Sequence, residues 1–180
     1  LCCGTGDLSF ALAKLVNPKG EVIGLDFAIE PLKIAKKYSL NRSVGLLSWV
    51  QSDALNTGLS ANEFDGIVMA YGLRNVSSKI ICLKEMYRLL KPGGSAGILD
   101  FNPLNDSKNQ KSFQLFYLRN FVVPVSMFFG MNESYSYIEQ SLKDFPSGYM
   151  QKKLALEACF SKAKYYKLAF GQMGILLLKK

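Results

Sequence analysis

The chain has 180 residues, of which 49% are hydrophobic and 20% charged, and this composition predicts one globular domain with a proper core. It contains no histidine, so a histidine triad or histidine metal site is excluded, and proton transfer must use carboxylate, tyrosine, lysine or water. The formal charge is +8, but the lysines are scattered, which favours a solvated basic surface over nucleic-acid binding.

The start of the chain is informative. It opens on Leu1, without a methionine, in what the pattern indicates is the last turn of a core strand. We therefore expect a fragment or an incomplete gene product, in which a targeting peptide would not be visible.

Helical and strand patterns then alternate along the chain. In order, we predict a helix over 7–15, a strand over 21–26, a helix over 30–38, strands over 46–51 and 64–70, a helix over 78–90 and a strand over 96–101. This order predicts an α/β fold with right-handed crossovers, in which a mainly parallel sheet carries helices on both faces.

The alternation ends after Asn102. The aromatic-rich stretch 109–131 is interpreted as an inserted helix on the core, as a lid over a greasy substrate or as a membrane-facing patch. Helices are predicted over 135–144 and 149–159, and a closing hairpin over 164–170 and 173–178. We expect one domain over 1–180, with a helical insertion or lid over 103–150. An antiparallel pair at the edge of a parallel sheet is typical of the Rossmann-like class I methyltransferases rather than of dehydrogenases.

Two glycines separated by one residue, Gly4 and Gly6, precede the first helix. Glycine permits a sharp strand-to-helix turn and a close ligand approach, and the unpaired N–H groups of a helix start attract a carboxylate or phosphate. Asp26 follows about 20 residues later, where a carboxylate accepts hydrogen bonds from ribose hydroxyls. Ser9 stands where a dinucleotide fingerprint has its third glycine, which favours S-adenosylmethionine over a dinucleotide oxidoreductase.

Further motifs follow in order: Cys3-Gly4-Thr5-Gly6-Asp7, Asp53-Ala54, Phe64-Asp65, Tyr71-Gly72-Leu73-Arg74-Asn75-Val76, Leu90-Lys91-Pro92-Gly93-Gly94 and Leu99-Asp100-Phe101. Together they resemble the UbiE/MenG family of quinone-biosynthesis C-methyltransferases over essentially the whole chain. Four other runs resemble its cyanobacterial and plastid branch, which methylates demethylphylloquinone: Asp26-Phe27, Val122-Val123-Pro124-Val125, Phe145-Pro146-Ser147-Gly148 and Gln172-Met173-Gly174.

The resemblance implies S-adenosylmethionine as cofactor and assigns residues to it. The turn Gly4-Thr5-Gly6 would hold the methionine end, Asp26 the ribose, and Asp53 with Ala54 the adenine. Without this context, Asp53 would be read as a helix cap or loop aspartate. Ala70 ends the fourth strand where bacterial relatives often carry serine, so a hydroxyl contact is lost there while a backbone contact can survive.

A second departure from the family pattern is Cys159, which stands before Phe160 where relatives usually carry glycine. We therefore expect residue 159 to avoid a left-handed backbone, or the local turn to differ.

The chemistry of a methyl sulfonium sets the catalytic requirements. The methyl group is already electrophilic, so the acceptor carbon must be activated as a reduced quinol with a partly deprotonated hydroxyl. Arg74 is the candidate for stabilising the quinolate oxygen, with Asn75 orienting it or the quinol, because both follow the strand that ends beside the cofactor. The alternative is that Arg74 ties its loop to a carboxylate such as Asp100. No residue stands out as a general base, and Tyr71 and a bound water remain open.

The implied partner is a prenylated quinol, with no nucleic acid. Peripheral membrane association is compatible with the basic charge, although no apolar run reaches the roughly 20 residues of a spanning helix. A homodimer is left open. The branch resemblance implies a chloroplast location, with the mitochondrion as alternative. The competing functions are methylation of a prenylated benzoquinol in ubiquinone biosynthesis and non-catalytic binding of S-adenosylmethionine.

Overall fold

A computed structural model describes residues 1–16, 20–40, 46–103, 140–142 and 144–180 of the chain. Its elements are α1 (Asp7–Leu15), β1 (Glu21–Asp26), α2 (Ile29–Ser39), β2 (Leu46–Gln51), β3 (Phe64–Ala70), α3 (Lys79–Leu89), β4 (Leu90–Phe101), α7 (Gly148–Glu157), β5 (Lys162–Leu168), the 3-10 turn η2 (Ala169–Gly171) and β6 (Met173–Lys179). The predicted alternation is confirmed. The predicted helix over 109–131 lies outside the described residues, as does most of 135–144, of which 140–142 are helical.

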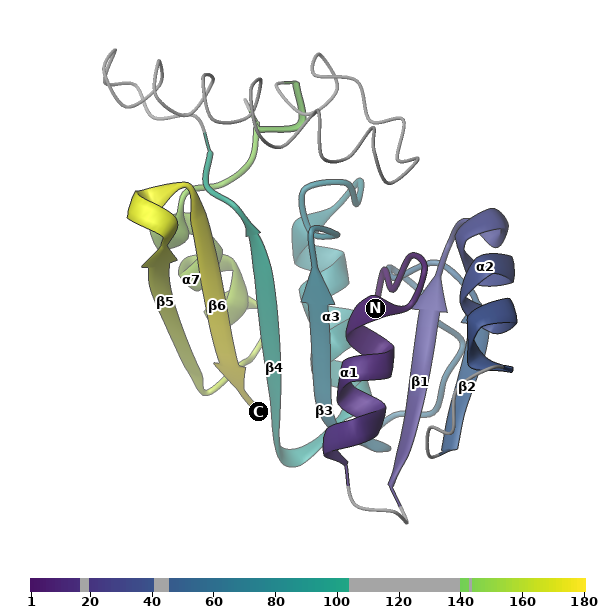
Figure 1. Ribbon diagram of the computed structural model, residues 1–180. Helices are drawn as coiled ribbons and strands as arrows, with labels where there is room; N and C mark the ends of the chain where they lie inside the picture. Colours follow the sequence, from purple (N-terminus) through teal and green to yellow (C-terminus); the bar gives the residue numbers. More distant parts are fainter. Residues whose placement is uncertain (17–19, 41–45, 104–139, 143) are drawn as a thin grey trace.

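The strands form two hydrogen-bonded sheets. β1 and β2 pair in parallel, with Asp26 opposite Gln51. The second sheet has the order β3-β4-β6-β5, in which β3 and β4 are parallel and β6 runs antiparallel to both of its neighbours. The closing antiparallel hairpin is thereby confirmed, with β5 at the edge. Figure 1 shows α3 and α7 behind the strands and α1 in front of them, so helices cover both faces.

β4 begins at Leu90 rather than at 96, the predicted start. Leu90 pairs with Phe64, the register then shifts, and regular pairing with β3 resumes at Ser95 opposite Gly66. Gly93 takes a φ of 78° within this irregular stretch, a conformation that costs glycine little. The Lys-Pro-Gly-Gly run ends the helix as expected, but the early start of the strand depends on the pairing of Leu90 with Phe64, more than 20 residues away, which periodicity does not reveal.

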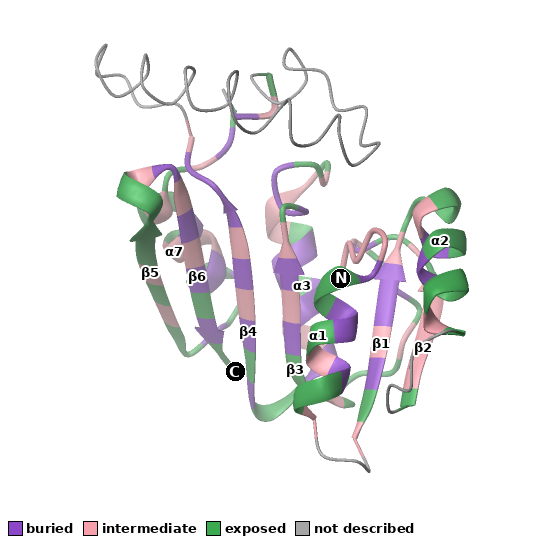
Figure 2. Cartoon of the chain, in the orientation of Figure 1, coloured by how far each residue is buried: buried purple, intermediate pink, exposed green. Residues whose placement is uncertain are grey.

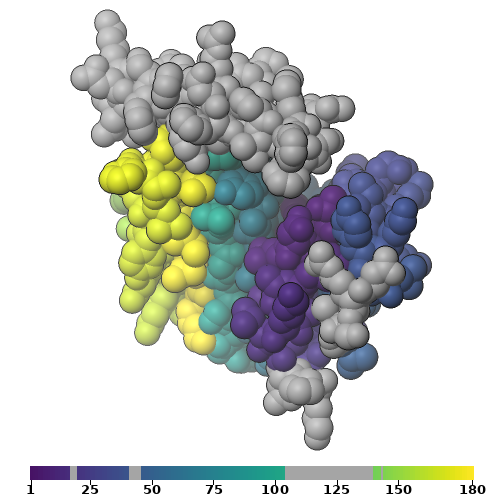
Figure 3. Space-filling model, viewed as in Figure 1, coloured from purple at the N-terminus to yellow at the C-terminus, as the bar shows by residue number. Residues whose placement is uncertain are grey.

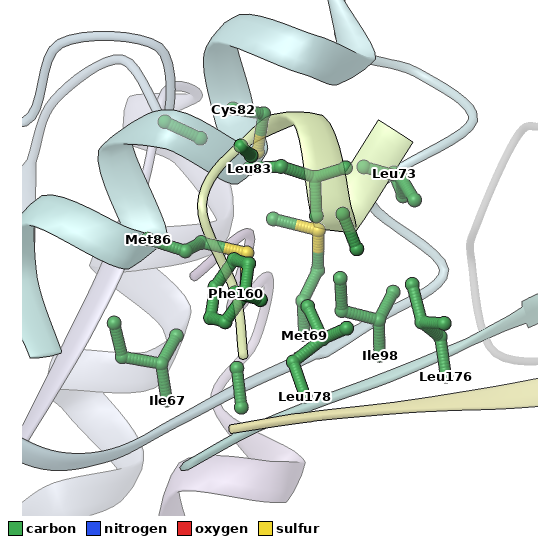
Figure 4. Close-up of a cluster of buried hydrophobic side chains, with 14 of the residues drawn as sticks. Ile67, Met69, Leu73, Cys82, Leu83, Met86, Ile98, Phe160, Leu176 and Leu178 are labelled. Atoms are coloured by element: carbon green, nitrogen blue, oxygen red, sulfur yellow. The ribbon is translucent and has the colours of Figure 1, made fainter. Parts of the chain in front are cut away.

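The main hydrophobic core lies between α3 and the four-stranded sheet (Figure 4). On α3, Cys82, Leu83, Met86 and Leu89 recur at helical spacing and are all buried. They face inward-pointing residues of β3, β4 and β6, among them Ile67, Met69, Ile98, Leu176 and Leu178. Figure 2 shows buried positions on β1, β3, β4 and β6, whereas β5 is largely exposed. This core fixes the ends of β3 and β4, where the candidate site begins.

The part of the expected insertion that the structure describes near its end is anchored in the core. Leu142 is fully buried, and Phe145 is buried and belongs to the main cluster. The rest of the 103–150 prediction, including the role of a lid, concerns residues that lie mostly outside the described ranges and stays a prediction.

Cys159 corrects one expectation. It takes a φ of 75°, so the prediction that this residue avoids the left-handed region is wrong. Its N–H donates to the Leu156 carbonyl at 3.0 Å, and the Phe160 N–H donates to the Ala155 carbonyl at 3.1 Å, which closes the end of α7. The turn places Phe160 in the core, edge-on to Tyr87 at 5.4 Å. Burial of this aromatic side chain offsets the backbone cost of a left-handed cysteine.

A cavity of about 610 Å³ lies between the two sheets. Its lining includes Val22 and Leu25 of β1, and Ile67 and Val68 of β3. Among the described strands, β1 pairs with β2 alone and β3 with β4 alone, so their facing edges border this space. Because the lining also takes in the amino-terminal ends of these strands, the cavity is distinct from the ligand edge described below.

The space-filling view shows one continuous face, from the closing hairpin (yellow) across β4 (teal) to α1 (purple) and α2 (Figure 3).

None of the helices in the described ranges combines the length and the apolar character needed to cross a membrane.

Candidate functional site

The glycine turn joins the first residues to α1. The Gly6 N–H donates to the Cys3 carbonyl at 2.9 Å, and the Gly6 carbonyl accepts from Phe10 as the helix starts. Gly4 and Gly6 take φ values of 53° and 89°, so both sit in the left-handed region. A Cβ on Gly6 would collide with the Trp49 ring, whereas a Cβ on Gly4 would meet open space. The turn is therefore packed on one side and open on the other.

Asp26 fastens this turn to the end of β1. Its Oδ2 accepts from the Gly4 N–H at 2.7 Å, and its Oδ1 accepts from the Ala28 N–H at 3.0 Å. Each carboxylate oxygen can accept a further hydrogen bond, so these contacts are compatible with ribose binding. Thr5 donates its hydroxyl to Asp7 at 2.9 Å in the first turn of α1. The structure thus brings Gly4, Gly6 and Asp26 together, as the spacing predicted.

Asp53 and Ala54 follow β2 in a tight turn. Asp53 Oδ1 accepts from the Leu55 N–H at 2.9 Å, and the Asp53 carbonyl accepts from the Asn56 N–H at 3.1 Å. Asp53 is exposed, whereas Ala54 is buried in the main core. The carboxylate makes the contact of a loop aspartate, and its adenine role stays a prediction, as does any backbone contact from Ala70, which ends β3 half-buried.

A buried polar cluster that the sequence analysis did not predict holds the loop after β2 against α3. Glu85 of α3 is buried, and its Oε1 accepts from the Thr57 N–H at 2.9 Å and hydroxyl at 2.6 Å. Arg88 donates to Glu85 Oε2 at 2.7 Å and to the Leu59 carbonyl at 2.7 Å. The Arg88 guanidinium, helped by Thr57, lowers the pKa of Glu85 to about 2. The E-x-x-R spacing was a visible signal, but its partner Thr57 is 28 residues away.

Arg74 is buried with its partner Asp100. The Arg74 N–H donates to Asp100 Oδ2 at 3.0 Å, and Nη1 donates to Oδ1 at 3.4 Å and to the Tyr71 carbonyl at 2.9 Å. Burial raises the pKa of the Asp100 carboxyl above its ordinary value, although the Arg74 charge opposes this. The guanidinium lies 5.4 Å from the Phe101 ring centroid. These contacts match the alternative in which Arg74 ties its loop to Asp100, and no contact tests a catalytic role.

Asn75 is exposed and donates its Nδ2 to the same Tyr71 carbonyl at 3.3 Å. Tyr71 itself takes a φ of 57°, and its N–H donates to the Leu99 carbonyl at 2.8 Å. An ideal Cβ on Gly72 would lie 2.6 Å from the Cβ of Cys2. The loop after β3 therefore packs directly against the glycine turn, and position 72 admits no side chain.

Together, these loops line one edge of the fold. Gly4 and Gly6, Asp26, Asp53 and the loop 71–75 follow or flank the carboxyl ends of parallel strands. Figure 1 shows the carboxyl ends of β1 and β3 at its upper side. Ligands of open α/β sheets bind at this edge. The open side of Gly4 and the start of α1 leave room for the sulfonium amino acid, so the residues fit S-adenosylmethionine. Among the described residues, no group of three or more cysteine, aspartate or glutamate side chains is placed to hold a metal ion.

Solved structures define the class of this fold. A methyltransferase from Aquifex aeolicus that depends on S-adenosylmethionine superposes with a TM-score of 0.72 at 16% identity, over 99% of this chain and 78% of that one. An arsenic(III) S-adenosylmethionine methyltransferase from Chlamydomonas reinhardtii superposes with a TM-score of 0.66 at 19% identity, over 99% of this chain and 60% of that one. The fold is that of the methyltransferases that use S-adenosylmethionine.

Residues 1–179 match the ubiE/COQ5 methyltransferase family, and the chain belongs to that family. It is 44% identical to 2-phytyl-1,4-naphthoquinone methyltransferase of Synechocystis sp., over 100% of this chain and 76% of the relative. It is 39% identical to the chloroplastic 2-phytyl-1,4-beta-naphthoquinone methyltransferase of Arabidopsis thaliana, over 98% of this chain and 69% of the relative. The chain is therefore a methyltransferase whose cofactor is S-adenosylmethionine, which confirms the predicted family, fold class and cofactor.

Proposed function

We propose that the chain methylates reduced 2-phytyl-1,4-naphthoquinone at its unsubstituted quinone-ring carbon. The observation that carries this proposal is identity of 39–44% along essentially the whole chain to cyanobacterial and chloroplastic relatives that bear this substrate in their names. The site supports it, because the loop 71–75, next to the glycine turn, combines the buried cation Arg74 with Tyr71, whose ring packs on Phe101 of β4.

The reaction needs an electron-rich ring carbon and an aligned methyl group. When bound, S-adenosylmethionine supplies an electrophilic methyl. The ring carbon forms the new C–C bond, the sulfur keeps the electron pair of the broken S–CH₃ bond, and the ring carbon releases its proton as aromaticity returns. Holding the two reactants in line is worth on the order of 7–11 kcal/mol.

The chain's own residues hold and orient the reactants. We assign the methionine end to the Gly4-Thr5-Gly6 turn, the ribose to Asp26, and the adenine to Asp53 and Ala54, with the backbone of Ala70 closing the site. Asp26 holds the turn in place through its 2.7 Å hydrogen bond from Gly4. Stabilisation of a quinolate oxygen by Arg74 and Asn75 stays a prediction. Their hydrogen bonds to the Tyr71 carbonyl favour an indirect effect, through the position of the loop 71–75.

The location and assembly are finer parts of this proposal. We infer a plastid location because the Arabidopsis relative is chloroplastic and two relatives of 43–44% identity over 100% of this chain are cyanobacterial. A prenylated quinol resides in lipid, so we also propose peripheral membrane association, for which a formal charge of +8 is favourable. Sedimentation of the purified protein would measure its oligomeric state, for which a homodimer is the predicted alternative to a monomer.

The test is transfer of a labelled methyl group from S-adenosylmethionine by the full-length protein. The acceptors are 2-phytyl-1,4-naphthoquinol and a prenylated benzoquinol, each with reductant, and the oxidised naphthoquinone without it. We expect transfer to the naphthoquinol and none to the oxidised quinone. Transfer to the benzoquinol alone would move the chain to ubiquinone biosynthesis, and cofactor binding without transfer to either quinol would refute the enzyme assignment.

A pair of aspartate variants tests the cofactor assignment. Asp26→Asn keeps the side-chain shape but removes the charge that we assign to the ribose, so we expect weaker binding of S-adenosylhomocysteine by calorimetry. The matched control is Asp65→Asn, because Asp65 is exposed near the amino-terminal end of β3 and pairs with Lys91. Equal affinity of both variants would contradict the role of Asp26.

A further inference from the structure

Tyr71 has an unusual backbone at the site. It follows β3 directly and takes a φ of 57°, which a bulky L-residue adopts at a cost. Strain of this kind persists where surrounding contacts determine it, and it concentrates at functional sites. Contacts from neighbouring residues must therefore hold this backbone, and the conformation marks Tyr71 as a candidate functional residue.

Three neighbours hold the Tyr71 backbone, and a fourth, Asp100, holds one of them. Its N–H donates to the Leu99 carbonyl at 2.8 Å, and its carbonyl accepts from Arg74 Nη1 at 2.9 Å and from Asn75 Nδ2 at 3.3 Å. Asp100 in turn accepts from the Arg74 backbone N–H at 3.0 Å and from the guanidinium. The two side chains predicted to be catalytic thus converge on one carbonyl.

These backbone hydrogen bonds orient the Tyr71 side chain across the end of the sheet, towards β4 and β6. The Tyr71 ring packs on Phe101 at the end of β4, with centroids 5.0 Å apart. Its hydroxyl donates to Sδ of Met173 at the start of β6, at 3.1 Å. A thioether is a weak acceptor, so an oxygen that reached the same hydroxyl would replace it favourably. The side chain is 38% exposed, which leaves it accessible to a ligand.

The loop also lies beside the cofactor turn. Gly72 packs against Cys2, which lies two residues before Gly4. The loop 71–75 therefore extends from the residues beside the glycine turn, through Gly72, to the ends of β4 and β6, through Tyr71. We infer that an acceptor ring that meets the methyl group lies beside this loop.

We propose that Tyr71 is the residue that contacts the reacting quinol, donating its phenolic hydrogen bond to the quinol oxygen and so favouring the deprotonated quinolate from which the ring carbon attacks. Arg74, Asn75 and Asp100 are positioning residues that act through Tyr71. This inference rests on the proposed function, since it concerns the acceptor of that same reaction. The quinol loses its O–H proton to solvent, and the hydrogen bond from Tyr71 raises the share of quinol present as quinolate. The negative charge then leaves the oxygen as the ring carbon bonds to the methyl group, and Tyr71 keeps its own proton throughout.

The first test is Tyr71→Phe in the full-length protein, which keeps the ring on Phe101 and removes the hydroxyl. We expect kcat and kcat/KM for the naphthoquinol to fall together by roughly 10- to 100-fold, as for loss of a hydrogen bond to the charged quinolate oxygen, with unchanged affinity for S-adenosylhomocysteine. The matched control is Tyr166→Phe, because Tyr166 of β5 is 47% exposed and lies in the closing hairpin. Equal activity of Tyr71→Phe and the wild-type protein would overturn the proposal.

The positioning roles are tested by a double-mutant cycle. Asn75→Ala alone is expected to lower kcat, because it removes one of the two side-chain hydrogen bonds that hold the Tyr71 carbonyl. Added to Tyr71→Phe, it is expected to cause almost no further loss, since its effect passes through the missing hydroxyl. Independent, multiplicative losses would instead show that Asn75 contacts the reactants directly and would overturn the positioning assignment.

The wild-type protein separates this inference from the proposed function. If it methylates the naphthoquinol and Tyr71→Phe does so equally well, the role of Tyr71 fails and the function stands. If the wild-type protein binds S-adenosylhomocysteine but methylates neither quinol, the proposed function fails, and the role of Tyr71 in it fails with it.

Discussion

Replacing Arg74 by methionine removes the guanidinium and keeps most of the side-chain volume. In the wild-type protein the side chains of Arg74 and Asp100 are only 3% and 4% exposed, so neither charge is screened by water. The variant leaves the Asp100 carboxylate with the N–H groups of residue 74 and Phe101, at 3.0 and 2.8 Å, but without a counter-charge. It also removes the Nη1 hydrogen bond to the Tyr71 carbonyl.

The expected cost is large because a buried charge loses its partner. Breaking such a pair costs about 3–5 kcal/mol, and the two remaining N–H groups place the loss near the lower end, about 3 kcal/mol. For a domain whose total stability is about 5–15 kcal/mol, this is a fifth or more of the total. The double variant Arg74→Met with Asp100→Asn removes both charges, so it should recover part of the loss.

The stability deficit of Arg74→Met depends on pH with a defined sign. Burial already raises the pKa of Asp100 above 3.8, and loss of the Arg74 charge raises it further in the folded state. A carboxyl whose folded pKa is raised stabilises the fold fully below its unfolded pKa and loses that contribution as pH rises through the folded pKa. The deficit should therefore widen as pH rises above 3.8. Urea unfolding at several pH values measures it, and a loss below about 1 kcal/mol at pH 7 would refute the reasoning.

Two further predictions concern the supports of the site. The Glu85 carboxyl has a folded pKa of about 2 against an ordinary 4.5, so it contributes up to about 3 kcal/mol above pH 4.5, which is lost as pH falls towards 2. Glu85→Gln should cost about 1–3 kcal/mol at pH 7 by urea unfolding, and a wild-type advantage that persisted at pH 2 would contradict this assignment. Gly6→Ala combines a φ of 89° with a clash against Trp49, so it should destabilise the fold by about 1–3 kcal/mol and weaken binding of S-adenosylhomocysteine. Gly93→Ala, at a φ of 78° with no atom within 4 Å of its Cβ, is the matched control, and unchanged cofactor affinity in Gly6→Ala would count against the turn as a binding element.

The local sequence pattern was enough to predict the order of helices and strands in the described part of the chain. Helical spacing identified α1, α2, α3 and α7, and runs of apolar residues identified the strands, because burial of one face imposes a period on the sequence. The glycine spacing and Asp26 also followed from sequence alone. Only glycine adopts the left-handed backbone at positions 4 and 6 without strain. The spacing of about 20 residues between this turn and Asp26 is the length of one helix and one strand, so it predicts a carboxylate at the end of the next strand.

The tertiary structure decided which distant groups meet. Arg74 meets Asp100 because β3 and β4 are parallel neighbours, and Thr57 meets Glu85 because α3 packs beside the loop after β2. No local period encodes such pairs, since their separation depends on strand order and register. The left-handed backbone of Tyr71 has the same origin, for it is imposed by partners from β4 and from its own loop. The local sequence thus predicts which residue types the site contains, but the roles of these residues depend on neighbours that only the folded chain brings into contact.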